Sequence, residues 1–369
     1  MKLAFGTGTA SGASWVTDLS RSLGFTFQEV DTESIESLIA GTEGCDAIIV
    51  ALHKLTAEKI AALPSSVRCI GRLGVGLDNI DLAAAEARHT PVIFQPTYAF
   101  NEVANHALAM IMALHRGLFQ ANKGIQSGEW IPAPKIARIT SLQDTTLGVV
   151  GCGRIGQSLI EKVKPLFKEI IGFDPAIKSL PGVELVSSLD ELLKRSEIVS
   201  LHAPYMKSTH HMIGAKELAT LRQGAILVNV SRGGLIDEVA LVESLKSGHL
   251  DGAGLDVFEK EPLEADSPLR SAPNLIMSPH IAWYSQSAGP RLMEWGVKDV
   301  LGYLSGNTTL NGNVTLGNAS GDTITVTGTS TFTESADFDG GLTIAGSQTV
   351  DAGGNKILNV GTPVSTTDA

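Results

Sequence analysis

Three residues able to handle a proton or an anion follow consecutive apolar runs of the chain. Arg232 follows "AILVN" in the stretch "NVSRGG", Glu261 closes "LDVFEKE", and His280 follows "NLIM" in "SPHIAWYS". Continuous apolar runs of this kind are typical of buried parallel strands. The carboxyl ends of such strands meet at one edge of the sheet, where α/β proteins bind their ligands. We therefore expect these three side chains to lie close together.

An arginine, a carboxylate and a histidine suit hydride transfer between a nicotinamide cofactor and a 2-keto or 2-hydroxy acid. The guanidinium of Arg232 can hold the substrate carboxylate in a two-point contact and polarise the adjacent carbonyl. The imidazole of His280 can donate a proton to the developing alkoxide and remove it in the reverse direction. Glu261, on the other ring nitrogen, would fix the tautomer and stabilise the imidazolium.

Each of the three residues also has a purely structural interpretation. Arg232 could serve as an ion-pair partner, Glu261 as a solvated residue at a helix start before Pro262, and His280 as a packed core histidine. A cofactor site beside them favours the chemical interpretation of all three together.

The stretch "VVGCGRIGQ" contains the pattern G-x-G-x-x-G after an apolar run and before a helical segment. The first glycine permits a tight turn, the second lets a pyrophosphate approach the backbone, and the third lets the helix pack closely. The positive end of the helix then faces the phosphates. The residues assigned to this cofactor turn are Gly151, Gly153, Arg154, Ile155 and Gly156.

Asp174 ends the next apolar run, "EIIGFD", 23 residues after Gly151. A carboxylate there can accept both ribose hydroxyl groups and would repel a 2′-phosphate, which predicts NAD rather than NADP. The alternative is a glycine turn with an unrelated surface aspartate. The agreement of strand, spacing and acid favours the dinucleotide site.

The elements that must position these residues form two series. "KLAFG", "DAIIVAL", "VRCIGRLG" and "PVIFQ" alternate with helical segments in the first part of the chain. A second series runs from "TLGVVGCG" to "NLIMSPH". Apolar strands that alternate with helices predict parallel sheets covered on both faces. The fold class is therefore α/β, with two such units.

Residues 307–369 differ sharply from the rest of the chain. They contain 14 threonines and one basic residue, Lys356, with apolar residues at alternate positions between Gly, Asn and Asp turns. This pattern predicts a β-type appendage. The alternating Thr, Val and Gly residues also suggest an adhesive or trimerising module as an alternative role for this segment alone. Its last residues, "GNKILNVGTPVSTTDA", resemble segments of phage tail-fibre proteins, which suggests a fused reading frame.

Composition narrows the class of protein further. The 369 residues are 43% hydrophobic and 18% charged, as in globular proteins, and the net charge of −11 argues against a nucleic-acid partner. Three scattered cysteines, Cys45, Cys69 and Cys152, suggest neither a disulfide framework nor a metal site. The most apolar helical stretch, "HALAMIMAL", is too short to span a membrane. We expect a soluble cytoplasmic protein.

At these motifs the sequence resembles the D-isomer-specific 2-hydroxyacid dehydrogenase family over about residues 1–305. The matching pieces, in the family's order, are "GVGLDNID", "VVGCGRIGQ", "LHAPYMKSTHHMIG", "LRQGAILVNVSRGGLIDE", "LDVFEKEP" and "PNLIMSPHIA". The resemblance implies two doubly wound, Rossmann- or flavodoxin-like domains with a cleft between them. Residues 1–98 with 284–306 would bind substrate, and residues 99–283 would bind NAD and form a homodimer.

The resemblance also implies roles for individual residues. Arg232, Glu261 and His280 would be the catalytic set. Backbone N–H groups of the "GVG" stretch would hold the substrate carboxylate, and three further residues would contact the cofactor. The implied substrate residues are Arg72, Val75 and Gly76, and the implied cofactor residues are His202, Pro204 and Asp256.

The stretch "LRSAPNLIMSPHIAWYS" resembles most the C-terminal-binding-protein branch of the family. That branch implies an alternative function, an NAD(H)-responsive binding protein with little turnover. Trp283 suggests an aromatic wall for a bulky apolar substrate side chain. Packing in the hinge between the two units is the structural alternative for Trp283.

Overall fold

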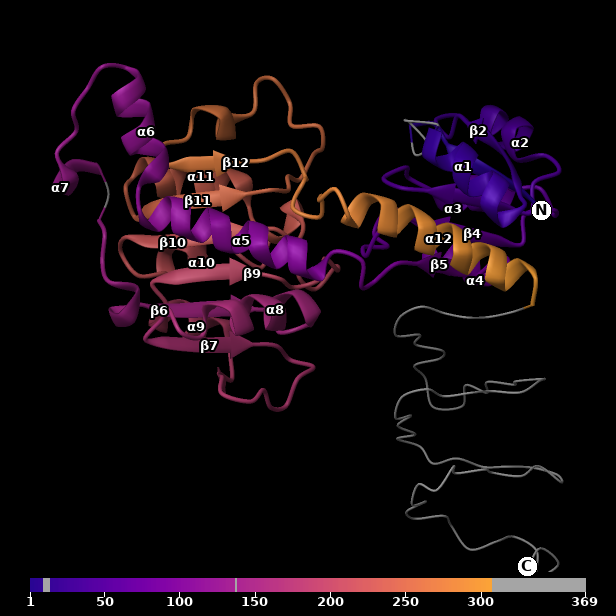
Figure 1. Ribbon diagram of the computed structural model, residues 1–369. Helices are drawn as coiled ribbons and strands as arrows, with labels where there is room; N and C mark the ends of the chain where they lie inside the picture. Colours follow the sequence, from indigo (N-terminus) through magenta and orange to yellow (C-terminus); the bar gives the residue numbers. More distant parts are fainter. Residues whose placement is uncertain (9–13, 137, 307–369) are drawn as a thin grey trace, which may run out of the picture. The chain divides into compact units, whose positions relative to one another are not determined.

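The computed structural model describes residues 1–8, 14–136 and 138–306 (Figure 1). The predicted β-type appendage, residues 307–369, lies outside the described residues. Within the described ranges, no helix is both long enough and apolar enough to cross a membrane.

The first sheet is formed entirely by parallel strands. They are β1 (Lys2–Gly6), β2 (Thr26–Val30), β3 (Ala47–Val50), β4 (Cys69–Arg72) and β5 (Val92–Phe94). Their spatial order is β2-β1-β3-β4-β5. Every residue of β3 and β4 is buried, which explains why "AIIV" and "CIGR" carry no alternation.

Helices cover the first sheet on both faces. One buried cluster takes residues from α2 (Ile35–Thr42), α3 (Ala57–Ala62) and α4 (Leu82–Ala87). The other cluster takes residues from α1 (Ser14–Leu23) and from α12 (Ala288–Leu304), the last described helix. The chain therefore returns to its first sheet after completing the second.

The second sheet is also formed entirely by parallel strands. They are β6 (Thr146–Val150), β7 (Glu169–Phe173), β8 (Glu184–Leu185), β9 (Ile198–Leu201), β10 (Ala225–Asn229), β11 (Leu250–Leu255) and β12 (Leu275–Met277). Their spatial order is β12-β11-β10-β9-β6-β7-β8. The order reverses at β6, and the carboxyl ends of β6 and β9 therefore form the position where such sheets bind ligands.

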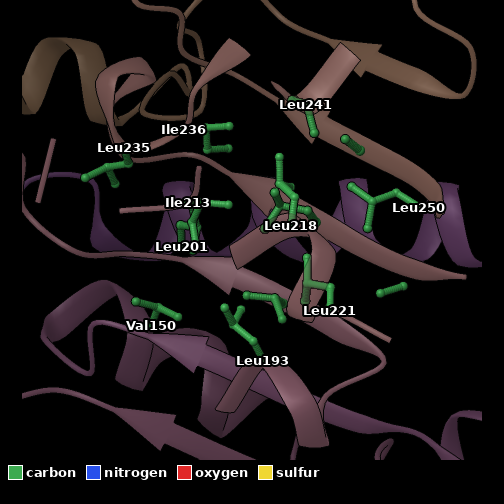
Figure 2. Close-up of a cluster of buried hydrophobic side chains, with 14 of the residues drawn as sticks. Val150, Leu193, Leu201, Ile213, Leu218, Leu221, Leu235, Ile236, Leu241 and Leu250 are labelled. Carbon is green, nitrogen blue, oxygen red and sulfur yellow. The ribbon is translucent and has the colours of Figure 1, made fainter. Parts of the chain in front are cut away.

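The second sheet is likewise covered on two faces. α5 (Phe100–His115) and α8 (Arg154–Val163) contribute to one buried cluster. α9 (Leu189–Arg195), α10 (Ala215–Thr220) and α11 (Glu238–Lys246) contribute to the other. Figure 2 shows part of this second cluster, with side chains from strands and helices interleaved between the layers. Its labelled residues include Val150, Leu193, Leu201, Leu218, Leu241 and Leu250.

Shorter elements connect these layers. They are α6 (Leu118–Gln126), α7 (Ala133–Ile136) and the 3-10 turns η1 (Leu142–Asp144), η2 (Gly233–Leu235) and η3 (Pro268–Ser271). The predicted α/β class with two parallel sheets is confirmed. The strand "TFQEV" was not predicted, because β2 is an edge strand with just one fully buried residue, Val30. An apolar run like those of the fully buried strands is absent there.

Candidate active site

The glycine turn joins β6 to α8, as predicted. Gly151 has φ +89°, and a Cβ added there would lie 2.5 Å from the backbone nitrogen of Ala203. A Cβ at Gly156 would lie 2.2 Å from the carbonyl oxygen of Gly151, so this glycine sets the close packing of the helix on the turn. A Cβ at Gly153 would meet nothing within 4 Å. Open space therefore lies over the middle glycine, where the motif requires room for a pyrophosphate.

The N-terminus of α8 can receive an anion. Its N-cap residue is Gly153, and no side chain caps the helix, so its first N–H groups are not satisfied by a capping side chain. Arg154 begins the helix and is exposed, while the neighbouring Ile155 packs against the buried cluster beneath α5 and α8.

Asp174 follows β7 and reaches across to the same turn. Its Oδ2 accepts a hydrogen bond from the backbone N–H of Cys152 at 2.8 Å, and its Oδ1 accepts one from Ala176 at 2.9 Å. The half-buried carboxylate is thus fixed beside the glycine turn. This is the placement that ribose recognition needs.

His202 follows β9 and lies against Gly151 through its backbone. Its Nε2 is 2.8 Å from the hydroxyl of Ser200, and its buried Nδ1 has no hydrogen-bond partner within the described residues. Burial lowers the pKa of His202 to about 4, so the ring is neutral at physiological pH. A buried, unpaired ring nitrogen beside the glycine turn fits a site completed by a ligand. Pro204 is exposed two residues further on.

Arg232 follows β10 and is held from two sides. Its Nε donates to Asp78 Oδ1 at 2.9 Å, and its Nη1 donates to the carbonyl of Ser231 at 2.8 Å. The hydrogen bond and positive charge of Arg232 outweigh the effect of burial and lower the pKa of Asp78. Asp78 comes from the loop after β4, so residues 154 positions apart in the sequence form this ion pair.

The last residue of β4, Arg72, brings a second cation to the loop that carries Asp78. A Cβ at Gly76 would lie 1.5 Å from Nη2 of Arg232, and one at Gly74 would lie 1.6 Å from Nη1 of Arg72. Both guanidinium groups therefore rest on a loop whose glycines leave room for them. Burial, and then the positive charge of Arg232, lower the pKa of the buried Arg72 to about 10. Val75, between the two glycines, is exposed.

Glu261 and His280 form a close pair. Glu261 Oε2 lies 2.6 Å from His280 Nδ1, and Glu261 Oε1 accepts the backbone N–H of Phe258 at 3.0 Å. Burial alone would raise the pKa of Glu261, but the hydrogen bond and charge of His280 lower it. An ionised carboxylate can only accept, so Nδ1 carries the proton and Nε2 is the ring nitrogen that Glu261 does not engage. No helix begins at Glu261, which excludes the helix-start interpretation.

The loop that carries His280 is held by Asp256. His280 adopts φ +54° and donates its backbone N–H to the Asp256 carbonyl at 2.8 Å. The buried carboxylate accepts from the Ser278 hydroxyl at 2.5 Å and from the backbone N–H groups of Ile281 and Ala282 at 3.0 and 2.8 Å. His106 Nε2 on α5 lies 2.9 Å from the same hydroxyl. Asp256 therefore fixes the histidine loop, and its predicted contact with nicotinamide stays a prediction.

Trp283 packs as its structural alternative requires. Its indole N–H donates to the His280 carbonyl at 2.9 Å, and its ring lies 6.2 Å from that of Tyr98. It contacts buried clusters belonging to both sheets. A further role as a wall of the substrate pocket stays a prediction.

The structure brings together three residues that were predicted from the sequence. The residues that hold them in place were not predicted. Arg232, Glu261 and His280 follow β10, β11 and β12, three neighbouring strands of one sheet. Asp78, Ser278 and His106 were missed, and the acid in "GLDNID" gives no local signal of its pairing with a distant arginine. Among the described residues, no group of three or more His, Cys, Asp or Glu side chains could hold a metal ion.

A glycine turn between a strand and a helix, with a carboxylate fixed beside it at the end of the next strand, is typical of a dinucleotide-binding α/β protein. Residues 108–282 match the family model of the D-isomer specific 2-hydroxyacid dehydrogenase, NAD binding domain. The chain is 36% identical over 283 residues to an (S)-sulfolactate dehydrogenase of Chromohalobacter salexigens, covering 75% of this chain and 90% of that relative. It is 38% identical over 249 residues to a D-3-phosphoglycerate dehydrogenase of Methanocaldococcus jannaschii, covering 66% of this chain and 47% of that relative.

A solved structure agrees with these sequence matches. The D-lactate dehydrogenase of Aquifex aeolicus, complexed with NAD and lactic acid, has a TM-score of 0.74 at 28% identity. The match covers 83% of this chain and 96% of that structure. The chain belongs to the D-isomer-specific 2-hydroxyacid dehydrogenase family. The predicted family and the predicted NAD cofactor are confirmed. The chain spans about half the length of the 3-phosphoglycerate dehydrogenases that it matches.

Proposed function

We propose that this protein is an NAD-dependent D-2-hydroxyacid dehydrogenase, with Arg232, Glu261 and His280 as its catalytic residues. The observation that carries the proposal is the 2.6 Å pair of Glu261 and His280, which follows β11 and β12 beside the arginine that follows β10. When bound, the nicotinamide cofactor supplies or accepts the hydride.

The chain's own residues would supply positioning and proton transfer. Arg232, with Arg72 near it, would hold the substrate carboxylate, assisted by the backbone N–H groups of Val75 and Gly76. His280 Nε2 would donate the proton to the oxygen that becomes the hydroxyl group. Glu261 would stabilise the imidazolium that forms in the reverse direction.

Cofactor binding would use the turn and the strand ends around it. His202, whose ring is neutral, and Pro204 would line the cofactor cleft, and Asp256 would contact the nicotinamide amide. The half-buried Asp174, at the end of β7, would contact the adenosine ribose. The glycine turn would hold the pyrophosphate, with the N-terminus of α8 facing it. The proposed residues of the turn are Gly151, Gly153, Arg154, Ile155 and Gly156.

The test is NADH oxidation with glyoxylate, pyruvate and phenylpyruvate. We expect turnover with at least one acid, and His280→Ala should lower kcat by on the order of 100-fold or more, because proton transfer contributes at least that much. NADH binding by that variant should stay close to wild type. Full activity of His280→Ala would refute the role assigned to His280.

A second candidate rests on the likeness of "LRSAPNLIMSPHIAWYS" to the C-terminal-binding-protein branch. On this proposal the protein is an NAD(H)-responsive binding protein with little turnover. Absence of turnover across the three keto acids, together with NADH-dependent self-association, would favour it over the dehydrogenase.

We also propose a cytoplasmic homodimer formed through the NAD-binding unit. Apolar side chains stand exposed on and after α6, with exposed fractions of 56% for Phe119, 59% for Ile125 and 86% for Trp130. A second copy of the chain would cover them. All three cysteines are free and buried, as in proteins of a reducing compartment. Light scattering that gives the mass of one chain would contradict the dimer.

The proposed division into domains follows the sheets. Residues 1–98 with 284–306 would form the substrate-binding domain and residues 99–283 the NAD-binding domain. α12, although last among the described helices, packs against β4 and β5 of the first sheet. The third proposed part, residues 307–369, would be the appendage.

A further inference from the structure

A second histidine–carboxylate pair lies beside the catalytic one. His211 Nε2 forms a short contact with Glu259 Oε1, and each side chain is about one-third exposed. Glu259 precedes Glu261 by two residues in the segment after β11. The two carboxylates of "EKE" therefore each engage a histidine, one from the segment after β9 and one from the segment after β12.

The segment that carries His211 is braced against the arginine loop. His211 adopts φ +49° and donates its backbone N–H to the Gly234 carbonyl at 2.8 Å. The Tyr205 ring covers Gly234, where an added Cβ would lie 2.6 Å from a ring carbon. The His210 ring stacks on His211 at 3.8 Å, and the Tyr205 hydroxyl lies 3.3 Å from His210 Nδ1. The contact with Glu259 thus ties the loop after Arg232 to the loop before Glu261.

The two catalytic loops also touch each other directly. A Cβ at Gly233 would lie 1.8 Å from the carbonyl carbon of Phe258, so the backbones pack without side chains between them. Glu259 donates its backbone N–H to Glu238 Oε1 at 2.8 Å, at the first residue of α11. Glu259 follows Phe258 in the chain, and the backbone N–H of Phe258 donates to Glu261. A displacement of Glu259 would therefore also displace Phe258 and the carboxylate that it holds.

Three carboxylates, those of Glu238, Glu259 and Glu261, lie close together around the contact between His211 and Glu259. Burial and the negative charges of Glu259 and Glu261 raise the pKa of Glu238. The basic side chains that face these three carboxylates are His211, His280 and Arg232, whereas Lys260 pairs with Glu264. His210 and Tyr205 are the remaining titratable groups that face His211. Loss of the His211 contact would leave Glu259 close to like charges, which favours its displacement.

We propose that Glu259 and His211 are positioning residues that hold Glu261 at hydrogen-bond distance from His280. The inference rests on the proposed function, because it presumes that Glu261 and His280 act together in proton transfer. A displacement of about 1 Å at a reacting group can lower turnover by on the order of 100-fold. The contact would therefore affect kcat more than substrate binding, which depends on Arg232.

The experiment compares four variants in NADH oxidation with glyoxylate, pyruvate and phenylpyruvate at saturating NADH. Glu259→Ala removes the contact, and Glu259→Gln keeps an oxygen that can accept from His211. Lys260→Ala is the matched control, because Lys260 lies between the two glutamates in the sequence and its ammonium group pairs with Glu264. Glu261→Gln is the benchmark for the catalytic pair. His211→Asn, which tolerates positive φ, replaces Glu259→Ala if that variant does not fold.

We expect Glu259→Ala to lower kcat roughly 10- to 100-fold with KM changed less than about threefold. Glu259→Gln should recover most of the rate. Because His280 lowers the pKa of Glu261, a looser pair should also move the acidic limb of the pH profile of kcat/KM to higher pH. Lys260→Ala should match wild type in all three measurements.

Two results would overturn the inference alone. The first is a Glu259→Ala variant that behaves like Lys260→Ala while Glu261→Gln is slow. The second is an equal loss of kcat in Glu259→Gln and Glu259→Ala. Glu259 would then act through its negative charge and not through the hydrogen bond to His211. Wild-type rates in Glu261→Gln, or no turnover of any acid by the wild type, would overturn the proposed function as well.

Discussion

Alanine at Gly153 should separate cofactor binding from folding. Gly153 has φ −70° and ψ −166°, which alanine adopts freely, and a Cβ there meets no atom within 4 Å. The protein itself therefore gives no steric reason for glycine at this position. The proposed reason is the pyrophosphate, which must approach the backbone where the methyl group would stand.

The expected loss follows from the hydrogen bonds that the methyl group would block. Each hydrogen bond from a helix N–H to a charged phosphate oxygen contributes roughly 1.5–3 kcal/mol. Loss of one such bond weakens NADH binding roughly 10- to 150-fold, because each 1.4 kcal/mol is about a factor of ten in Kd. Alanine is also a poorer N-cap than glycine, by at most about 1 kcal/mol of stability.

Gly156→Ala is the matched comparison within the same turn. Its Cβ would lie 2.2 Å from the Gly151 carbonyl oxygen, so α8 must move away from the turn. Overpacking of this kind costs roughly 1–3 kcal/mol. The thermal midpoint should fall by roughly 2–4 °C per kcal/mol in a domain of this size. Gly156→Ala should therefore destabilise the protein more than Gly153→Ala does.

The assay is a fluorescence titration with NADH beside a thermal melt of each variant without cofactor. We expect Gly153→Ala to melt close to wild type and to bind NADH at least about tenfold more weakly. Wild-type NADH affinity in Gly153→Ala would refute the placement of the pyrophosphate over this glycine. It would leave the packing role of Gly156 untouched.

Three further outcomes are expected. Asp174→Ser should narrow the preference for NADH over NADPH, since the carboxylate no longer repels a 2′-phosphate; an unchanged ratio of the two kcat/KM values would contradict the ribose contact. Trp283→Ala should lower kcat/KM for phenylpyruvate more than for glyoxylate if the indole forms a wall of the substrate pocket. If the order of the kcat/KM values of the acids is the same in the variant and the wild type, Trp283 serves packing alone. The pKa values of Glu261 and Asp78 are lowered in the folded protein, so their stabilising pairs are complete above the usual carboxyl pKa of about 4 and lost as pH falls through the lowered values. Urea unfolding between about pH 5 and pH 3 should therefore show falling stability, with a shallower slope in Glu261→Gln; an identical slope would count against that pair.

The sequence was sufficient for the fold class because parallel strands buried on both faces lose their alternation. β3, β4, β6, β9 and β10 are buried along their whole length, and their apolar runs are visible without any structure. The edge strands β2 and β8 have partly exposed residues and few neighbours, so their sequences resemble those of loops.

The candidate site divides in the same way. Arg232, Glu261 and His280 follow recognisable strands, so their convergence could be predicted from topology. The residues that hold these three side chains in place could not be predicted. Asp78 contacts Arg232 across 154 positions of sequence, and the hydroxyl of Ser278 meets His106 across 172. No local pattern encodes such pairings, because they depend on how the loops pack once the sheets have formed.

The backbone geometry of His280 depends on the buried acid Asp256. Positive φ is costly for a residue with a Cβ, on the order of 1 kcal/mol, and persists where surrounding contacts determine it. At φ +54°, His280 is fixed by its own N–H on the Asp256 carbonyl and by Trp283 on its carbonyl oxygen. Asp256 also accepts the next two backbone N–H groups, so the backbone on both sides of the histidine is determined. With the backbone fixed, the imidazole ring of His280 could still rotate, and its hydrogen bond to Glu261 restricts that rotation.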